Sequence, residues 1–189
     1  MRLKAFFQKQ AWYPDYTRMT DDPDLVIRHF LRDLVFQHRL RYMIYFRTSQ
    51  TTKNYFLSLF CKYRLYRMSR KFGIEIKPST HIGPGFVMTH PYNITVFPSA
   101  ILGRNITLMK GSTIGLSHGK HPGAPTIGDS VYVGINSTIL GGITVGDDVL
   151  VAPNTLITQD VPSHSVVIGN PCTIIHKENA TAPYIWKKV

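Results

Sequence analysis

The sequence predicts a mainly β protein, in which a solenoid of short parallel strands follows an α-helical N-terminal part. Large aliphatic residues recur at every sixth position in the second part of the chain. Composition also divides near Gly73, because residues 1–73 hold 15 Lys/Arg, 5 Asp/Glu and 16 of the 22 aromatic residues, whereas residues 74–189 hold 7 Lys/Arg and 6 Asp/Glu. The 189 residues suffice for one sizeable core with a helical cap.

Residues 1–73 are expected to form the basic, aromatic-rich helical part. Asp22 is a suitable helix N-cap, and Pro23 suits the first helical position. Residues 24–47 contain no Gly or Pro and place apolar side chains at helical spacing, which predicts one continuous helix.

A second helix is expected from Lys53 to Phe72, closed by Gly73. The preceding "SQTT" predicts a break, because its hydroxyl side chains can cap helix ends. Residues 1–20 show too irregular a pattern to assign.

The six-residue repeat lies within residues 74–177. Each large aliphatic residue is mostly followed by a small one, and small or β-branched residues stand four places after it. This period fits neither a helix nor a long flat strand, but it fits a prism with a corner at each hexad. Coils of three hexads would stack about 4.8 Å apart, and four or five coils fit between Ile76 and Ile168. The clearest run of aliphatic positions is Ile127, Val133, Ile139, Val145, Val151 and Ile157.

Two irregularities interrupt the repeat. Between Met88 and Val96 the spacing is eight residues instead of six, and His90 lies in this interval. The segment 115–126, rich in Gly, Pro and His, is too long for a corner and predicts an extruded loop. Solenoids usually tolerate such breaks on their functional face, so we expect the chemistry there. Residues 178–189 follow the repeat as a C-terminal tail.

These features resemble the hexapeptide-repeat acyltransferases, whose fold is a left-handed parallel β-helix. Residues 72–177 look like serine acetyltransferase and the O-acetyltransferases of capsule and colanic-acid exopolysaccharides. "EIKPSTHIGPGFVMTHP" is similar to the family pattern D-I-H-P-x-A-x-I-G-x-G-x-x-x-D-H, and "VPSHSVVIGNPCTII" resembles the closing V-P-x-x-x-x-x-x-G-x-P-A-x-x-V. The handedness is implied by this resemblance and not by the period.

The resemblance implies that His90 is the catalytic base of an acetyl transfer to a hydroxyl. Imidazole, with a reference pKa near 6.5, suits removal of the hydroxyl proton at neutral pH. Glu75 occupies the place of the family's Asp, which orients the histidine. The separation of 15 residues is about one coil plus the turn, so stacking could bring Glu75 and His90 together.

The expected acceptor is a sugar hydroxyl of a capsule, exopolysaccharide or lipopolysaccharide precursor, because two family residues that would hold an amino acid are missing. Thr89 replaces an Asp, and Ala124 replaces the His of an R-H-P-x-I loop motif. The alternatives are serine O-acetylation in cysteine biosynthesis and a non-catalytic scaffold with a basic binding region, and acyl groups other than acetyl stay open. The candidate acceptor-binding residues are Thr89, Tyr92, His118, Lys120 and His121.

The resemblance further implies acetyl-CoA as co-substrate, held in a groove between neighbouring β-helices of a homotrimer. No metal is expected, because a base activates the acceptor and no His/Cys/Asp cluster has ligand spacing. The candidate CoA-binding residues are Gly134, Ile135, Ala152, Pro153, Asn170, Pro171 and Lys177.

The chain is expected to be cytoplasmic. No secretory signal and no apolar run of 18 residues is present, and Cys61 and Cys172 suggest two thiols in a reducing compartment. The basic, aromatic helices would suit a phosphate-bearing, lipid-linked acceptor at the inner face of the membrane, although such residues often form only a solvated face and a local core. Nucleic acid is not expected, since no motif for it accompanies the charge.

Overall fold

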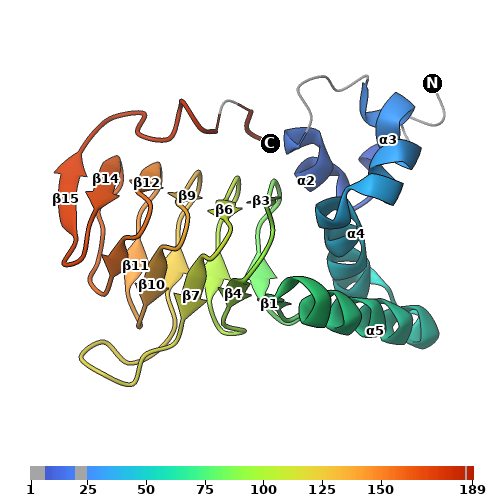
Figure 1. The fold of residues 1–189 in the computed structure, drawn as a ribbon, viewed down its shortest axis with the longest axis horizontal. Coiled ribbons are helices and arrows are strands. Elements are labelled where there is room, and N and C mark those ends of the chain that lie inside the picture. The colour runs from blue at the N-terminus through green and yellow to red at the C-terminus, as the bar shows by residue number, and fades with distance from the viewer. Residues whose placement is uncertain (1–6, 20–24, 186) are drawn as a thin grey trace.

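The computed structural model describes residues 7–19, 25–185 and 187–189, and shows a parallel β-solenoid capped at its N-terminal end by helices (Figure 1). In the described residues, no helix is both long and apolar enough to cross a membrane. The helices are α2 (Tyr13–Arg18), α3 (Leu25–Phe36), α4 (His38–Thr51) and α5 (Tyr55–Phe72).

The expected single helix over residues 24–47 is wrong, because α3 and α4 are separated at Gln37, which is extended (φ −99°, ψ 99°). The two helices bury different faces. Phe30 of α3 stacks on Trp12 with ring centroids 5.3 Å apart, whereas Phe46 of α4 packs into the solenoid core. One straight helix would not serve both contacts, so tertiary packing overrides the local helical preference. The proposed cap at Asp22 and Pro23 lies outside the described residues.

Helix α5 begins at Tyr55 and ends at Phe72, close to the expected bounds. The Asn54 side chain accepts a hydrogen bond from Leu57 N, and Gly73 closes the helix in the left-handed conformation with φ 68°. The expected break at "SQTT" lies slightly later, because α4 continues to Thr51.

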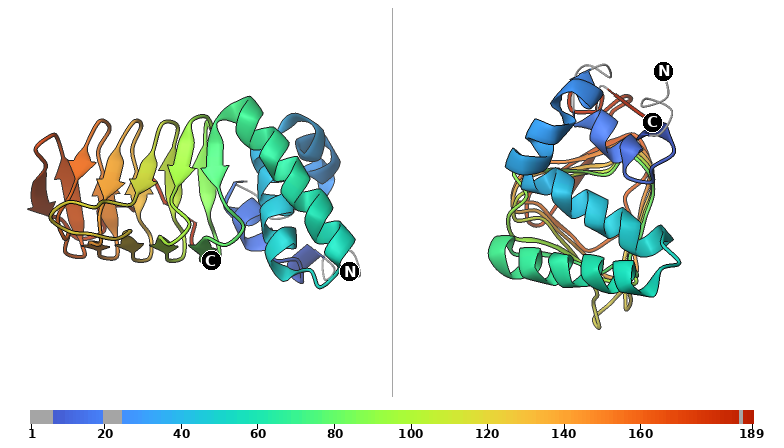
Figure 2. Two further views of the ribbon diagram at one scale, coloured as in Figure 1. Left: turned by 90° about the horizontal axis from the view of Figure 1, so that it is seen from below. Right: turned by 90° about the vertical axis from the view of Figure 1, so that its right-hand side faces the viewer.

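Three parallel sheets form the faces of the prism, which Figure 2 shows end-on (right). In sheet A the order is β1-β4-β7-β10-β13, in sheet B β11-β8-β5-β2, and in sheet C β15-β14-β12-β9-β6-β3, with β15 antiparallel. Five coils result, in agreement with the four or five expected. The strands are β1 Ile74–Ile76, β2 His81–Ile82, β3 Val87–Thr89, β4 Ile94–Val96, β5 Ile101–Leu102, β6 Thr107–Met109, β7 Thr113–Gly115, β8 Thr126–Ile127, β9 Tyr132–Val133, β10 Thr138–Leu140, β11 Thr144–Val145, β12 Val149–Val151, β13 Leu156–Ile157, β14 Ser165–Ile168 and β15 Thr173–His176.

The repeat positions form the core, since all six aliphatic residues of the clearest run, Ile127 through Ile157, are buried. At two of the three edges, one residue of every coil has positive φ, which glycine, Asn and Asp adopt most readily. One such column is Gly73, Asn93, Gly111, Asn136 and Asn154, and the other is Gly85, Asn105, Ser130, Asp148 and His164.

We name the edges by the sheets that they join. The C–A edge lies between each sheet C strand and the following sheet A strand, the A–B edge follows sheet A, and the B–C edge follows sheet B. The two columns of positive φ mark the C–A and B–C edges.

The C-terminal tail is folded against the solenoid. It runs back from β15 toward α2 along the B–C edge (Figure 1). Asp148 accepts hydrogen bonds from Ala180 N and from Thr181 N and Oγ1, and Val189 N donates to Asn105 Oδ1. Residues 178–185 and 187–189 therefore cover one edge of the prism.

Candidate active site

The candidate base and most of the candidate CoA-binding residues lie along one edge of the prism. His90 follows β3, Gly134 and Ile135 follow β9, Ala152 and Pro153 follow β12, and Asn170 and Pro171 follow β14, so all belong to the C–A edge. Backbone hydrogen bonds stack this edge from coil to coil: Gly111 N donates to Tyr92 O, Asn136 N to Lys110 O and Asn154 N to Ile135 O, at 2.9–3.1 Å.

His90 lies in the only coil of this edge that has two additional residues. Its side chain is exposed, and its backbone has φ 50° although it lies outside both columns. Tyr92 N donates a hydrogen bond to His90 O at 2.8 Å, which closes the bulge. The chain returns to the regular column at Asn93, and the extra length therefore lifts His90 out of the strand ladder.

The helices support this bulge from behind. Asn93 N donates to Phe72 O at 3.0 Å, and the Tyr92 ring lies 5.8 Å from the Phe72 ring. His38 of α4 stacks on Phe72 with centroids 4.3 Å apart and lies 5.3 Å from Tyr92. Burial lowers the pKa of His38, so its imidazole is held neutral against these rings. Sequence patterns alone did not identify His38, because its partners lie far along the chain.

Glu75 lies in the middle of β1, one coil below Thr95, and its side chain is exposed. It lines a cavity of about 540 Å³ between α5 and the first strands of sheet A, together with Lys62 and Lys77. Among the described residues, no hydrogen bond or ion pair joins Glu75 to His90. The expected separation of one coil plus the turn is wrong: Glu75 pairs with Thr95, so His90 lies in the same coil as Glu75, before that coil closes.

Thr89 lies at the end of β3, next to His90, and lines a different cavity of about 400 Å³. Arg18, Arg39 and Lys187 contribute positive charge to this cavity, and none of the described residues that line it has a carboxylate. Burial lowers the pKa of Arg18 to about 10, and its guanidinium still donates to Lys187 O and to Thr107 Oγ1. Tyr92, by contrast, is 47% exposed and packs on the helices.

The extruded loop lies at the A–B edge, away from His90. A pair of backbone hydrogen bonds joins Ser117 and Gly123 at 2.9 Å, and Gly142 N donates to His121 O, so the loop folds over a later coil. His118 and Lys120 are exposed at its tip. Figure 2 (left) shows the loop running along the solenoid. Within one chain, these three candidate acceptor residues are therefore not brought to the edge of His90.

The candidate CoA-binding residues do not all lie on the same edge, and they differ in the backbone groups that they can offer. Pro153 has no N–H to offer, and the neighbouring Asn154 N–H is used by Ile135 O. Asn170 and Pro171, joined by a cis peptide bond, end the edge at the last coil. Lys177 lies at the other end of β15, where its N–H donates to His164 O on the B–C edge.

Comparisons with known proteins agree with this architecture. Residues 124–159 match the family described as bacterial transferase hexapeptide (six repeats). Serine acetyltransferase 2 of Arabidopsis thaliana is 40% identical over 111 residues, which is 58% of this chain and 34% of that protein. Serine acetyltransferase of Staphylococcus epidermidis is 36% identical over 115 residues, 59% of this chain and 54% of that protein. The matched regions thus span between a third and about half of these relatives.

Solved structures show the same fold. The serine acetyltransferase of Neisseria gonorrhoeae in complex with serine superposes with a TM-score of 0.66 and 25% identity, covering 92% of this chain and 69% of that one. A serine acetyltransferase in complex with cysteine gives a TM-score of 0.72 at 20% identity, covering 92% and 72%.

Proposed function

We propose that this chain is an acetyl-CoA-dependent O-acetyltransferase with His90 as general base, because its solenoid matches that of the hexapeptide-repeat acyltransferase superfamily. One observation carries the proposal: the edge that holds most of the candidate CoA-binding residues is also the edge at which the coil bulges and exposes His90. The first and last coils are four coil spacings apart, so the edge is about 19 Å long and offers an extended groove for the pantetheine arm.

In the proposed reaction, the acceptor oxygen attacks the thioester carbonyl while the His90 imidazole accepts the hydroxyl proton. The carbon–sulfur bond then breaks, and the CoA sulfur leaves with a proton returned from His90. Glu75 would orient the imidazole once its side chain turns toward it, as the family's Asp does. Backbone amides and carbonyls of the C–A edge would hold the pantetheine arm.

The relatives support L-serine as the acceptor, which is the alternative and not the sugar hydroxyl expected first from the sequence. The matched proteins are serine acetyltransferases, and one solved neighbour holds serine. The matches cover 58–59% of this chain.

A specific observation keeps a sugar hydroxyl as the second candidate. The two positions at which the family would hold an amino acid carry no charge, since Thr89 and Ala124 replace Asp and His. The charged residues that the structure describes around the neighbouring cavity are all basic, which favours an acceptor with phosphate or carboxylate groups. In either case the reaction would take place in the cytoplasm, in homotrimers whose sites lie between subunits.

Release of CoA from acetyl-CoA, followed with a thiol reagent, tests the proposal. The purified chain is given L-serine, sugar nucleotides and acidic oligosaccharides in parallel. A serine kcat/KM above about 10⁴ M⁻¹s⁻¹ would identify serine as the natural acceptor. Transfer to a sugar with slower serine turnover would identify the second candidate. If no hydroxyl compound releases CoA faster than water does, the chain is a scaffold and the proposal is wrong.

A further inference from the structure

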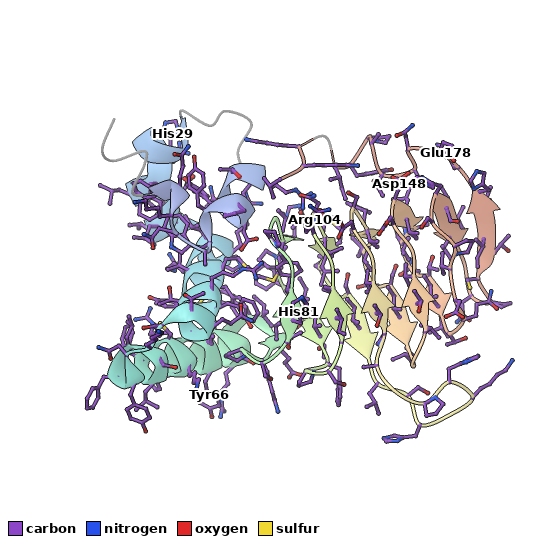
Figure 3. All side chains as sticks on the ribbon, turned by 180° about the vertical axis from the view of Figure 1, so that it is seen from behind. His29, Tyr66, His81, Arg104, Asp148 and Glu178 are labelled. Atoms are coloured by element: carbon purple, nitrogen blue, oxygen red, sulfur yellow. The ribbon has the colours of Figure 1, made fainter. Side chains whose placement is uncertain are left out.

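Helix α5 exposes an unusually apolar outer surface. Its inner face, Cys61, Leu65 and Met68, is buried against the rest of the molecule. The outer surface still carries large apolar side chains, of which Phe56 is 79% exposed. Figure 3 shows side chains standing out from this helix, with Tyr66 labelled. The exposed set is Tyr55, Phe56, Leu57, Leu59, Phe60, Tyr63 and Tyr66.

The second half of α5 is strongly basic. A groove of about 880 Å³ runs along it, and the described residues that line it include five cationic side chains and no carboxylate. Arg67 Nη1 donates to Tyr63 Oη at 3.1 Å, and Arg70 Nη1 donates to Tyr66 Oη at 2.9 Å, so the guanidiniums are held beside aromatic rings. The cationic residues are Arg41, Arg64, Arg67, Arg70 and Lys71.

The charge of the surrounding sequence identifies the partner. Between Asp33 and Glu75 the chain has nine Lys/Arg and no Asp or Glu. A second copy docked through this surface would set like charges against each other, which disfavours a self-contact. An anionic partner is favoured instead. Exposed Phe and Leu side chains suit the acyl boundary of a bilayer, and Tyr with Arg suits its headgroups.

We propose that α5 docks on a phospholipid bilayer that contains anionic lipid. The apolar first half, around Phe56 and Phe60, enters the interface, and the basic groove binds lipid phosphates. Basic charge and apolar area each give weak binding, and together they give stable attachment. This inference does not depend on the acetyl-transfer proposal, because neither half of α5 contains the candidate base.

Docking would also bring the candidate base close to the membrane. Phe72, at the basic end of α5, receives the hydrogen bond from Asn93 N and contacts Tyr92, and both residues belong to the bulge that carries His90. An acceptor carried on a lipid phosphate could then reach the C–A edge.

Sedimentation of the full chain with vesicles tests the proposal. We expect binding to vesicles of phosphatidylcholine with 30% phosphatidylglycerol (about 30% is a physiological anionic content), weakening with salt, and little binding to phosphatidylcholine alone. R67E/R70E should lower the partition coefficient about 30-fold or more, and F56S/F60S should lower it at least about 10-fold. The control K9E/K188E has the same charge change on exposed side chains outside α5 and outside the C–A edge, and it should bind within about 3-fold of wild type.

Several results would overturn the proposal. If R67E/R70E and the control bound vesicles equally well, the net charge of the chain, and not the position of the charges on α5, would account for binding. A fall in molecular mass by light scattering in F56S/F60S would show that the surface joins copies of the chain. Binding to RNA but not to vesicles would assign the groove to another polyanion. Circular dichroism and acetyl transfer to a soluble acceptor should be unchanged in all variants, because every substituted side chain is exposed.

Discussion

His90 combines three features that ordinary corner residues do not show together. It is exposed, it adopts positive φ outside both edge columns, and it lies in a two-residue bulge. Holding a non-glycine residue in this conformation costs free energy, and such strain is concentrated at functional sites. The spacing in the sequence was sufficient to predict this bulge, because the hydrophobic period has to slip wherever residues are inserted.

We predict that His90→Ala lowers kcat for acetyl transfer about 100-fold or more, because the acceptor hydroxyl loses its general base. His81→Ala is the matched control, since His81 is also exposed but lies on β2 in sheet B. Steady-state kinetics on both purified variants is the measurement. Retention of near-normal turnover by His90→Ala, in a chain with wild-type circular dichroism, would remove His90 from the mechanism.

The buried ion pair between Arg47 and Asp15 joins the helical part to the first coil. Arg47 Nε lies 2.8 Å from Asp15 Oδ2, and its two terminal nitrogens donate to the carbonyls of Ile82 and Gly83. Asp15 Oδ1 in turn accepts a hydrogen bond from Phe86 N at 2.7 Å. This cluster therefore fixes α2 and α4 against the B–C edge.

We predict that Arg47→Ala lowers the free energy of unfolding by about 3–5 kcal/mol, because it leaves a buried carboxylate without its partner. Arg104→Ala is the control: its ion pair with Asp129, at 2.7 Å, is formed by side chains that are 62% and 35% exposed. That loss should cost about 1 kcal/mol or less. Urea unfolding of the two variants measures both values, and equal losses would contradict the role of the buried pair.

The attachment of the C-terminal tail to the solenoid depends on the ionised carboxylate of Asp148 and therefore on pH. Burial alone would raise the pKa of this carboxyl, but hydrogen bonds from Thr181, His164 and Ala180 outweigh burial and hold the pKa below its usual range. Because the pKa of Asp148 is lowered in the folded state, its contact with the tail is stabilising when the pH is above the ordinary Asp pKa, near 3.9. This stabilisation is lost as the pH falls below that value and the carboxylate takes up a proton.

We therefore expect the tail to detach in acid, below about pH 3.9, before the solenoid unfolds. The amide resonances of Ala180 and Thr181 should move toward random-coil values there. Asp148→Asn should shift them at neutral pH and remove their acid transition, while Asp147→Asn, whose side chain contacts Asp129 N and not the tail, should behave as wild type. Unchanged tail resonances in Asp148→Asn would refute this account.

The elements differ in how well the sequence predicts them. The solenoid and the end of α5 were predictable because their signals are local in the sequence. Ile139 belongs to a regular six-residue repeat, and Gly73 adopts the positive φ that ends a helix. The break at Gln37 was not, because it depends on what Phe30 and Phe46 pack against. The candidate CoA-binding residues lie along one edge because the coils stack in register, and this could be predicted from the repeat. A contact between Glu75 and His90 depends instead on the rotation of their side chains and on how the subunits assemble.

In the whole molecule, one chain leaves its candidate site incomplete. His90 lies on the C–A edge, and the loop with His118 and His121 lies on the A–B edge over a later coil. A three-fold axis parallel to the solenoid would place the A–B edge of one copy beside the C–A edge of the next, through a heterologous interface that closes. The complete site would then require two chains.

We expect a homotrimer, with a mass by light scattering about three times the 21.5 kDa of the chain. A sharper test mixes two inactive variants. One carries His90→Ala, and the other has loop residues 117–123 replaced by a short glycine linker. Reassembled together, random trimers should regain about a quarter of wild-type activity, because each heterologous interface needs an intact His90 from one copy and an intact loop from its neighbour. If both elements of a site came from the same chain, the mixture would stay inactive. A monomeric mass at micromolar concentration would contradict the shared site directly.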